Sequence, residues 1–164
     1  MMLKGVLLLC FIAVLSACTS YPIRSSGYKN YDNTEYPNTL SPEKAQGLAV
    51  YALGLVGTPY KWGGNTPESG FDCSGLIAYV YQSQTGVKSP RTVAGLRNWG
   101  REISRQQLRT GDILLFGPSQ EPSHAGIYVG EDRFVHAPST GGTVRLNKLT
   151  TAYWREKELS IRRP

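Results

Sequence analysis

The apolar residues of this chain change their spacing at Gly111, and this change limits the possible fold more than any other feature of the sequence. Before Gly111 they recur every three or four residues, as on one face of a helix. After Gly111 they lie in short runs separated by turn residues, as in strands. Because such short connections cannot hold parallel crossovers, the pattern predicts an α+β domain in which helices are followed by an antiparallel sheet.

Three helices are expected before Gly111. The first begins with a capping hydroxyl and a proline, Ser41 and Pro42, and its inward residues are Ala45, Leu48, Ala49, Ala52 and Val56. The second follows Asp72 and ends near Gly86, with the inward residues Leu76, Ile77 and Val80. The third is short and begins after Thr92, with the candidate core residues Val93, Ala94 and Leu96. The strands are expected at 113–116, 124–130, 133–137, 143–146 and 159–162.

The N-terminal segment has the pattern of a secretory signal. A short positive stretch ends at Lys4, residues 6–15 are apolar, and small residues precede Cys18. We therefore expect a signal peptide over residues 1–17, because the apolar stretch is shorter than the roughly 20 residues of a membrane span. The motif LSAC also resembles the lipobox of bacterial lipoproteins, which implies cleavage before Cys18, acylation of Cys18 and attachment to a membrane. The alternative is ordinary cleavage near Ala17, which leaves Cys18 as a free thiol.

The remainder of the chain is expected to form a tether and one domain. Residues 18–40, with the lipidated residue at their start, are rich in Ser, Asn, Thr, Tyr, Pro and Gly and have no helical or alternating period, which indicates a flexible tether. Residues 41–164 have the length of a single domain, which we expect to be monomeric. We place the protein in the cell envelope, at the outer membrane facing the periplasm if the host has one.

Cys73 is left without a partner cysteine in this interpretation. Cys10 is removed with the signal peptide and Cys18 is acylated, in a compartment where paired cysteines are normally oxidised. A lone thiol is either a small buried hydrophobe or a nucleophile. Asp72 is a good N-cap and places Cys73 in the first turn of a helix, where free N–H groups lower a thiol pKa and can hold an oxyanion. This position favours the nucleophile.

The two histidines of the chain, His124 and His136, lie on one predicted hairpin. His124 faces away from the apolar residues that alternate with it. His136 shares the face of His124 only if the connection is a three-residue loop over 130–132, or an equivalent bulge. In that register Gly126 leaves space between the two imidazoles, which come within reach of each other.

A thiol, a base and a residue that orients the base form the general arrangement of an activated cysteine. Cys73 would be the nucleophile, and His124 would take the thiol proton and later donate it to the leaving amine. His136 would fix the tautomer of His124 and stabilise its positive form.

Six motifs of the chain resemble, in order and approximate spacing, those of the NlpC-type cell-wall endopeptidase family, which has a papain-like fold. They are GTPYKWGG, FDCSGLIAYVY, SPRT, GDILLF, SHAGIYVG and FVHA. The resemblance implies a Cys-His-His peptidase, without metal or cofactor, that hydrolyses bonds in the peptide stems of peptidoglycan. It assigns Cys73 as nucleophile, His124 as base, His136 as third polar residue and Tyr60 as a neighbour of the nucleophile that steadies oxyanion or substrate.

The resemblance leaves the substrate bond open. Asp72 and Ser74 match positions near the substrate amine in some members of the family, although capping explains Asp72 equally well. Thr110 stands where the family usually has proline, and Val93 where it has a small or hydroxyl residue. Members cut either between D-glutamate and diaminopimelate or at the D-alanine to diaminopimelate crosslink, and pocket loops decide between them.

Other classes of function also fit part of the sequence. One cysteine with two histidines can bind zinc, although these residues lack close ligand spacing. A wall-binding lipoprotein without catalysis, and an amidase or acyltransferase on the same triad, are further alternatives. Six basic residues and one acidic residue lie over 88–109, which suits wall polymer, lipid headgroups or simply a solvated face. Nucleic acid is not an expected partner of an exported lipoprotein.

Overall fold

The computed structural model describes residues 40–164. The predicted signal peptide, the acylation of Cys18 and the tether up to residue 39 lie outside the described residues. Within residues 40–164, no helix has the length and apolar character needed to cross a membrane.

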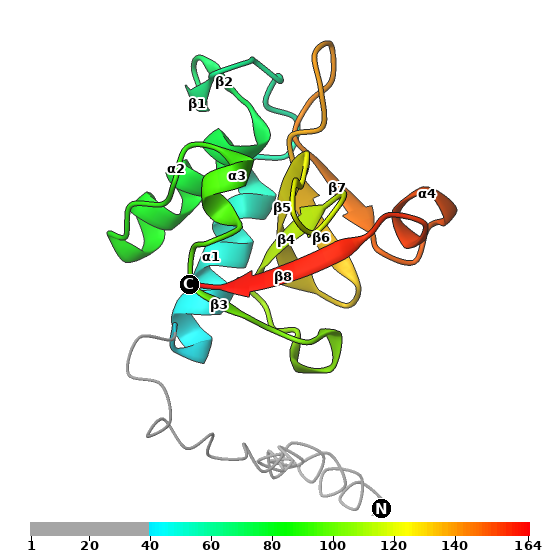
Figure 1. Ribbon diagram of the computed structural model, residues 1–164. Coiled ribbons are helices and arrows are strands. Elements are labelled where there is room, and N and C mark those ends of the chain that lie inside the picture. The colour runs from blue at the N-terminus through cyan, green and yellow to red at the C-terminus, as the bar shows by residue number, and fades with distance from the viewer. Residues whose placement is uncertain (1–39) are drawn as a thin grey trace, which may run out of the picture. The chain divides into compact units, whose positions relative to one another are not determined.

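The described residues form helices packed on an antiparallel sheet, which confirms the predicted α+β fold. The helices are α1 Pro42–Gly54, α2 Cys73–Thr85, α3 Val93–Leu96, α4 Ala152–Arg155 and the 3₁₀ turn η1 Arg105–Gln107. The strands of the larger sheet are β3 Arg101–Glu102, β4 Ile113–Phe116, β5 His124–Gly130, β6 Arg133–His136, β7 Arg145–Lys148 and β8 Leu159–Arg163, in the order β3-β8-β4-β5-β6-β7. A separate small ladder joins β1 Asn65–Thr66 to β2 Gly70–Phe71 just before α2. The helices α1, α2 and α3 lie on one side of the larger sheet, and α4 lies beyond its other side (Figure 1).

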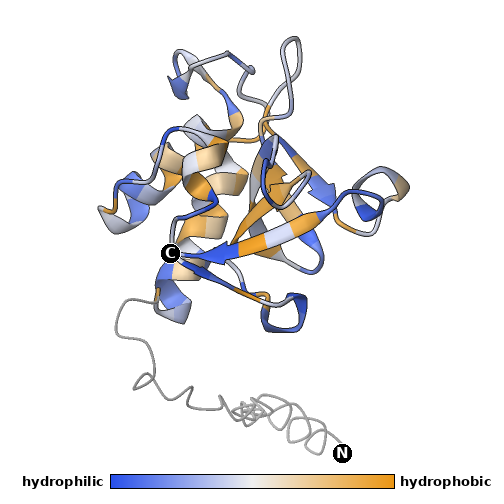
Figure 2. Cartoon of the chain, in the orientation of Figure 1, coloured by the Kyte–Doolittle hydropathy of each residue, from blue (hydrophilic) through white to orange (hydrophobic). Residues whose placement is uncertain are grey.

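Apolar side chains cover both faces of the sheet. One cluster joins α1 and α2 to the sheet through residues such as Leu48, Leu76 and Ile127. The second lies on the opposite face and is centred on Phe116 and Phe134, with Trp154 packed against it. Apolar residues are concentrated on the helices and central strands, whereas the loops are largely hydrophilic (Figure 2). All four residues of β4 are buried because it lies between the two clusters.

The ends of α2 are set by the residues that the sequence indicated. Asp72 is the N-cap, and its Oδ1 accepts a hydrogen bond of 2.6 Å from the Gly75 amide. Gly86 ends the helix with a φ of 74°, a conformation that glycine adopts without steric cost. Cys73 is therefore the first residue of α2, as predicted.

Several predicted core residues and boundaries are wrong at the edges of elements. Val56 is 45% exposed, because α1 ends at Gly54 and the chain has turned away before Val56. Ala94 is exposed because α3 is a single turn that buries Leu96 and packs Val93 partly against the core. The strand expected over 143–146 begins at Arg145 instead, since the Val144 amide bonds to the carbonyl of residue 58, outside the sheet. β6 likewise stops at His136, one residue before the predicted end.

The hairpin of β5 and β6 contains the irregularity on which the two histidines depend. Tyr128 pairs with Phe134 and Gly130 pairs with Arg133, so residue 129 is an extra residue on one side. The turn itself has two residues, Glu131 and Asp132, with φ values of 51° and 54°. The bulge at residue 129 thus provides the one-residue shift between the strands. The sequence analysis expected this shift from either a three-residue loop or a bulge.

Asp112 forms a buried ion pair with Arg163. The two side chains share two contacts of 2.7 Å, and the Arg109 amide donates to the same carboxylate at 2.7 Å. Arg163 also donates to the Gln107 carbonyl at 2.6 Å. The pair fastens the end of β8 to the start of β4.

Replacement of Asp112 by alanine should lower the free energy of unfolding by about 3–5 kcal/mol, because it leaves the Arg163 guanidinium buried without its counter-ion. Glu131→Ala breaks the exposed contact with Arg133 and should cost less than about 1 kcal/mol. Urea unfolding of both variants measures the difference. Equal losses would show that the buried pair does not fasten the sheet.

Candidate active site

Cys73 lies where the N-terminus of α2 meets the start of β5. Its thiol is free and only partly buried. The backbone N–H of Ala125 lies close enough to the sulfur to lower the pKa of the thiol, as do the N–H groups of Ser74 and Cys73 at the start of the helix. Because Ala125 directly follows His124 in β5, the sulfur lies beside the strand that carries the first histidine.

The pKa of the Cys73 thiol is raised rather than lowered, contrary to the expectation from its helix position. Burial is the main cause, and the negative charge of Asp72 adds to it. The N–H groups of Ala125, Ser74 and Cys73 act in the opposite direction but do not outweigh these effects. The free protein therefore holds this sulfur as a thiol at neutral pH.

The two histidines are joined to each other and to Asn147 by a chain of hydrogen bonds. His124 Nε2 lies 2.8 Å from His136 Nδ1, and His136 Nε2 lies 3.1 Å from Asn147 Oδ1. An amide oxygen only accepts hydrogen bonds, so His136 Nε2–H must donate to Asn147. His136 Nδ1 then accepts from His124 Nε2–H, which leaves the lone pair of His124 on Nδ1.

Aromatic rings enclose this histidine pair. Trp154 stacks on His124 with centroids 5.8 Å apart and meets His136 edge-on at 5.1 Å. His124 also stacks on Phe116. Burial lowers the pKa of His124 to about 3, with the neighbouring His136 adding to the effect. Burial likewise lowers the pKa of His136 to about 4, where the Asn147 hydrogen bond opposes the shift and the Arg145 charge increases it.

Gly126 gives the histidine pair its room. A Cβ at this position would lie 2.8 Å from Cδ2 of Phe134 and 3.3 Å from Cβ of His136. Any side chain here would displace the Phe134 ring or the backbone of β6, the strand that carries His136.

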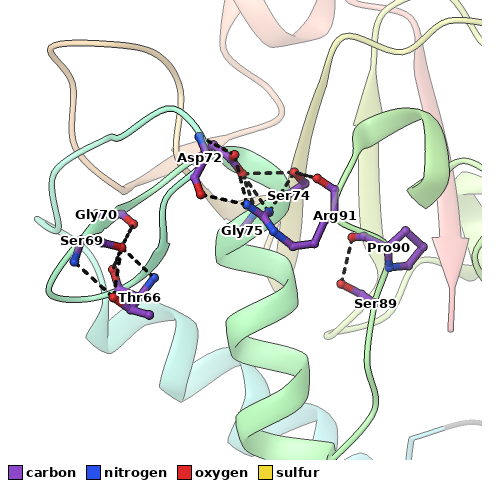
Figure 3. A network of polar contacts seen from close by, with 10 residues as sticks. Thr66, Ser69, Gly70, Asp72, Ser74, Gly75, Ser89, Pro90 and Arg91 are labelled. Atoms are coloured by element: carbon purple, nitrogen blue, oxygen red, sulfur yellow. Dashed lines mark hydrogen bonds and ion pairs between the residues drawn. The ribbon is translucent and has the colours of Figure 1, made fainter.

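A polar network centred on Asp72, Ser74 and Arg91 lies at the start of α2 (Figure 3). The Asp72 carboxylate receives hydrogen bonds from Arg91 at 3.1 Å, from the Ser74 hydroxyl at 3.1 Å and from the Gly63 amide at 3.0 Å. Burial raises the pKa of Asp72, but the bonds from Arg91, Gly75 and Ser74 outweigh it and hold the pKa below its ordinary value. Asp72 is therefore both a helix cap and a fixed negative charge beside the thiol.

Tyr60 belongs to the same side of the site. Its backbone forms an isolated parallel β-bridge with Phe71, the last residue of β2. Burial raises the pKa of its hydroxyl, and the charges of Cys73 and Asp72 raise it further. This electrostatic influence shows that the phenol lies close to both residues.

A pocket of about 930 Å³ opens on the histidine side. His124, His136, Arg145, Asn147 and Trp154 contribute to its lining. Within residues 40–164, no group of three His, Cys, Asp or Glu side chains is close enough to hold a metal ion.

Of the predicted site residues, His124 and His136 are hydrogen-bonded to each other, and Tyr60 lies close enough to Cys73 for the two groups to interact electrostatically. The two pairs are related through Ala125, which follows His124 in β5 and whose backbone lies near the Cys73 sulfur. Cys18 lies outside the described residues.

Three functional neighbours were not recognised in the sequence: Asn147, Trp154 and Arg91. Arg91 lies in the motif SPRT, which was a signal for it. Asn147 and Trp154 lie near the C-terminus, beyond the motifs, so only the tertiary contacts identify them.

A family model described as the NlpC/P60 family matches residues 57–163. The chain therefore belongs to the NlpC/P60 family, which confirms the resemblance read from its motifs.

Similar proteins and structures agree with this assignment. The chain is 39% identical to "Probable endopeptidase YafL" of Escherichia coli K12, over 87% of this chain and 60% of that protein. It is 45% identical to "Probable peptidoglycan endopeptidase LytE" of Bacillus subtilis 168, over 71% of this chain and 33% of that protein. The crystal structure of the NlpC/p60 domain of peptidoglycan hydrolase SagA superposes with a TM-score of 0.64 and 32% identity, over 71% of this chain and 97% of that one. The chain thus spans no more than 60% of the length of these two curated relatives.

The lowered histidine pKa values predict how stability depends on pH. Both groups have an ordinary pKa of 6.5 and titrate lower in the folded protein, so the unfolded chain binds protons that the folded chain excludes. Stability is fully present above pH 6.5 and falls as the pH decreases toward 4, by about 1.4 kcal/mol per pH unit for each such proton.

Urea unfolding between pH 7.5 and pH 5 measures this loss. The double variant His124→Gln/His136→Asn should show a flatter profile over the same interval. Parallel profiles for the wild type and the double variant would contradict the burial of neutral imidazoles.

Proposed function

We propose that this protein is a cysteine endopeptidase that hydrolyses an amide bond in the peptide stems of peptidoglycan. The observation that carries the proposal is the histidine pair, hydrogen-bonded at 2.8 Å beside the helix terminus that holds a free thiol. Membership of the NlpC/P60 family and the similarity to the probable endopeptidase YafL support the reaction class, and the similarity to the probable peptidoglycan endopeptidase LytE supports the substrate.

Cys73 and His124 carry the first half of the reaction in this proposal. The raised thiol pKa and the lowered imidazole pKa mean that both groups are neutral before substrate binds. As the sulfur attacks the scissile carbonyl carbon, its proton passes to the free Nδ1 of His124. The resulting oxyanion is stabilised by the N–H groups at the start of α2, with Tyr60 beside them.

His124 then completes the cycle. Its Nδ1–H protonates the leaving amine as the carbon–nitrogen bond breaks, and a thioester remains on Cys73. A water molecule, deprotonated by His124, hydrolyses the thioester and restores the thiol. His136 and Asn147 hold His124 in the required tautomer throughout, and the ring of Trp154 shields their hydrogen bonds from water.

Cys73→Ala should reduce cleavage of purified peptidoglycan fragments by at least about 10³-fold, because the nucleophile is lost. Mass spectrometry of the products measures the loss and identifies the cut bond. Alkylation of the wild type with iodoacetamide should have the same effect, whereas EDTA should have none. Ser83→Ala, an exposed change on the same helix, serves as the control and should retain full activity. Undiminished cleavage by Cys73→Ala would refute the mechanism.

We also propose that the domain is anchored in the cell envelope through acylated Cys18. The motif LSAC after an apolar segment supports this, as does the polar stretch over 19–40 that would link the anchor to the domain. In a host with an outer membrane, the domain would face the periplasm.

Cells grown with an alkyne-labelled palmitate should incorporate the label into the wild type and not into Cys18→Ser. The variant should also leave the membrane fraction. Cys10→Ser is the matched control, because residue 10 is removed with the signal peptide, and it should retain both label and location. Labelling of Cys18→Ser equal to that of the wild type would exclude this anchor.

A further inference from the structure

We propose that Arg145 binds a carboxylate on the leaving half of the substrate, in the pocket beside His124. This inference rests on the proposed hydrolase function and extends it to substrate recognition. The ligand chemistry is an amino-acid residue that follows the scissile bond and carries a free carboxylate.

The mechanism decides which half of the substrate enters this pocket. His124 protonates the leaving nitrogen, so this nitrogen and the residue attached to it must lie on the His124 side of Cys73. The pocket of about 930 Å³ is lined by His124 and His136 and continues to the segment after α4. The acyl half then lies toward Tyr60 and the Asp72 network.

Arg145 is built into the wall of this pocket. It lies directly opposite His136 in the pairing of β6 with β7, so both side chains leave the sheet on the same face. Its positive charge lowers the pKa of His136, which shows that the guanidinium is close to the histidine pair. A Cβ on Gly142 would lie 3.2 Å from Nη2 of Arg145, so the glycine leaves room for the guanidinium.

The guanidinium of Arg145 is available for a ligand. Among residues 40–164, its side chain has no hydrogen bond and no ion pair, whereas Arg91, Arg162 and Arg163 each face a carboxylate. A guanidinium binds a carboxylate through two parallel hydrogen bonds, a geometry that lysine cannot reproduce.

Two other charged residues of the pocket lining, Glu158 and Lys157, are already engaged. Glu158 accepts a hydrogen bond of 2.8 Å from the Ser119 amide, and the Lys157 ammonium lies 4.7 Å from the centre of the Tyr153 ring. These contacts leave Arg145 as the cation beside the reacting histidine. A carboxylate is therefore the group that the wall next to His136 is suited to receive.

Two synthetic stem peptides that differ only in the residue after the scissile bond test this inference. One carries a free carboxylate on that residue, and the other carries a carboxamide. The wild-type mature protein should cleave the carboxylate form with a kcat/KM about tenfold higher or more, as expected for hydrogen bonds to a charged group.

Arg145→Gln should abolish this preference, mainly through a higher KM for the carboxylate form, and Arg145→Lys should restore part of it. Arg155→Gln, an exposed change on α4, is the matched control and should keep the preference. A wild type that cleaves both peptides equally, or an Arg145→Gln variant that keeps the preference, would overturn the inference.

Binding to the Cys73→Ala protein separates this inference from the proposed function. Calorimetry should show tighter binding of the carboxylate peptide, and Arg145→Gln in the same background should remove the difference. If this pattern appears although the wild type cleaves neither peptide, the pocket assignment stands and the hydrolase proposal falls. Equal binding of both peptides would refute the pocket assignment itself.

Discussion

The hydrogen bond between His124 and His136 is the interaction on which the candidate site depends. It needs both rings on one face of the sheet, and the bulge at residue 129 provides this by shifting β6 by one residue relative to β5. It also needs Gly126, because any side chain there would collide with Phe134 or His136. The turn between β5 and β6, the bulge at residue 129 and Gly126 are thus all needed to pair the two imidazoles on one face of the sheet.

The Cys73 thiol resists losing its proton, and the imidazoles of His124 and His136 resist gaining one. Burial raises the pKa of Cys73 and lowers those of both histidines, so neutral forms prevail at neutral pH. In the proposed mechanism the proton moves only when a substrate carbonyl is present and the helix N–H groups can stabilise the oxyanion. Such a pair protects the thiol from unwanted reactions, because the thiolate is the reactive form.

Much of the fold could be predicted because it follows from local patterns. The change of apolar spacing at Gly111 predicted helices before an antiparallel sheet, and Asp72 and Gly86 marked the ends of α2. The alternation along β5, together with the need for a shared face, led to the bulge as one of two solutions. These features depend on residues close together in the sequence.

The remaining features depend on contacts that local patterns do not encode. Asp112 and Arg163 are 51 residues apart, and nothing near either one identifies the other. Asn147 is positioned only by the register of β7, which begins two residues later than expected because residue 144 pairs with the loop before β1. The pKa of Cys73 was predicted in the wrong direction because the helix terminus was visible in the sequence and the burial was not.

Nitrogen-15 NMR of the imidazole rings tests the central claim most directly. At pH 7 the described chain of hydrogen bonds predicts that both histidines are neutral, each with its proton on Nε2 and its lone pair on Nδ1. Asn147→Leu should remove this preference at His136 and, through it, at His124. A proton on Nδ1 of His124 in the wild type, or a positively charged imidazole at pH 7, would contradict the account.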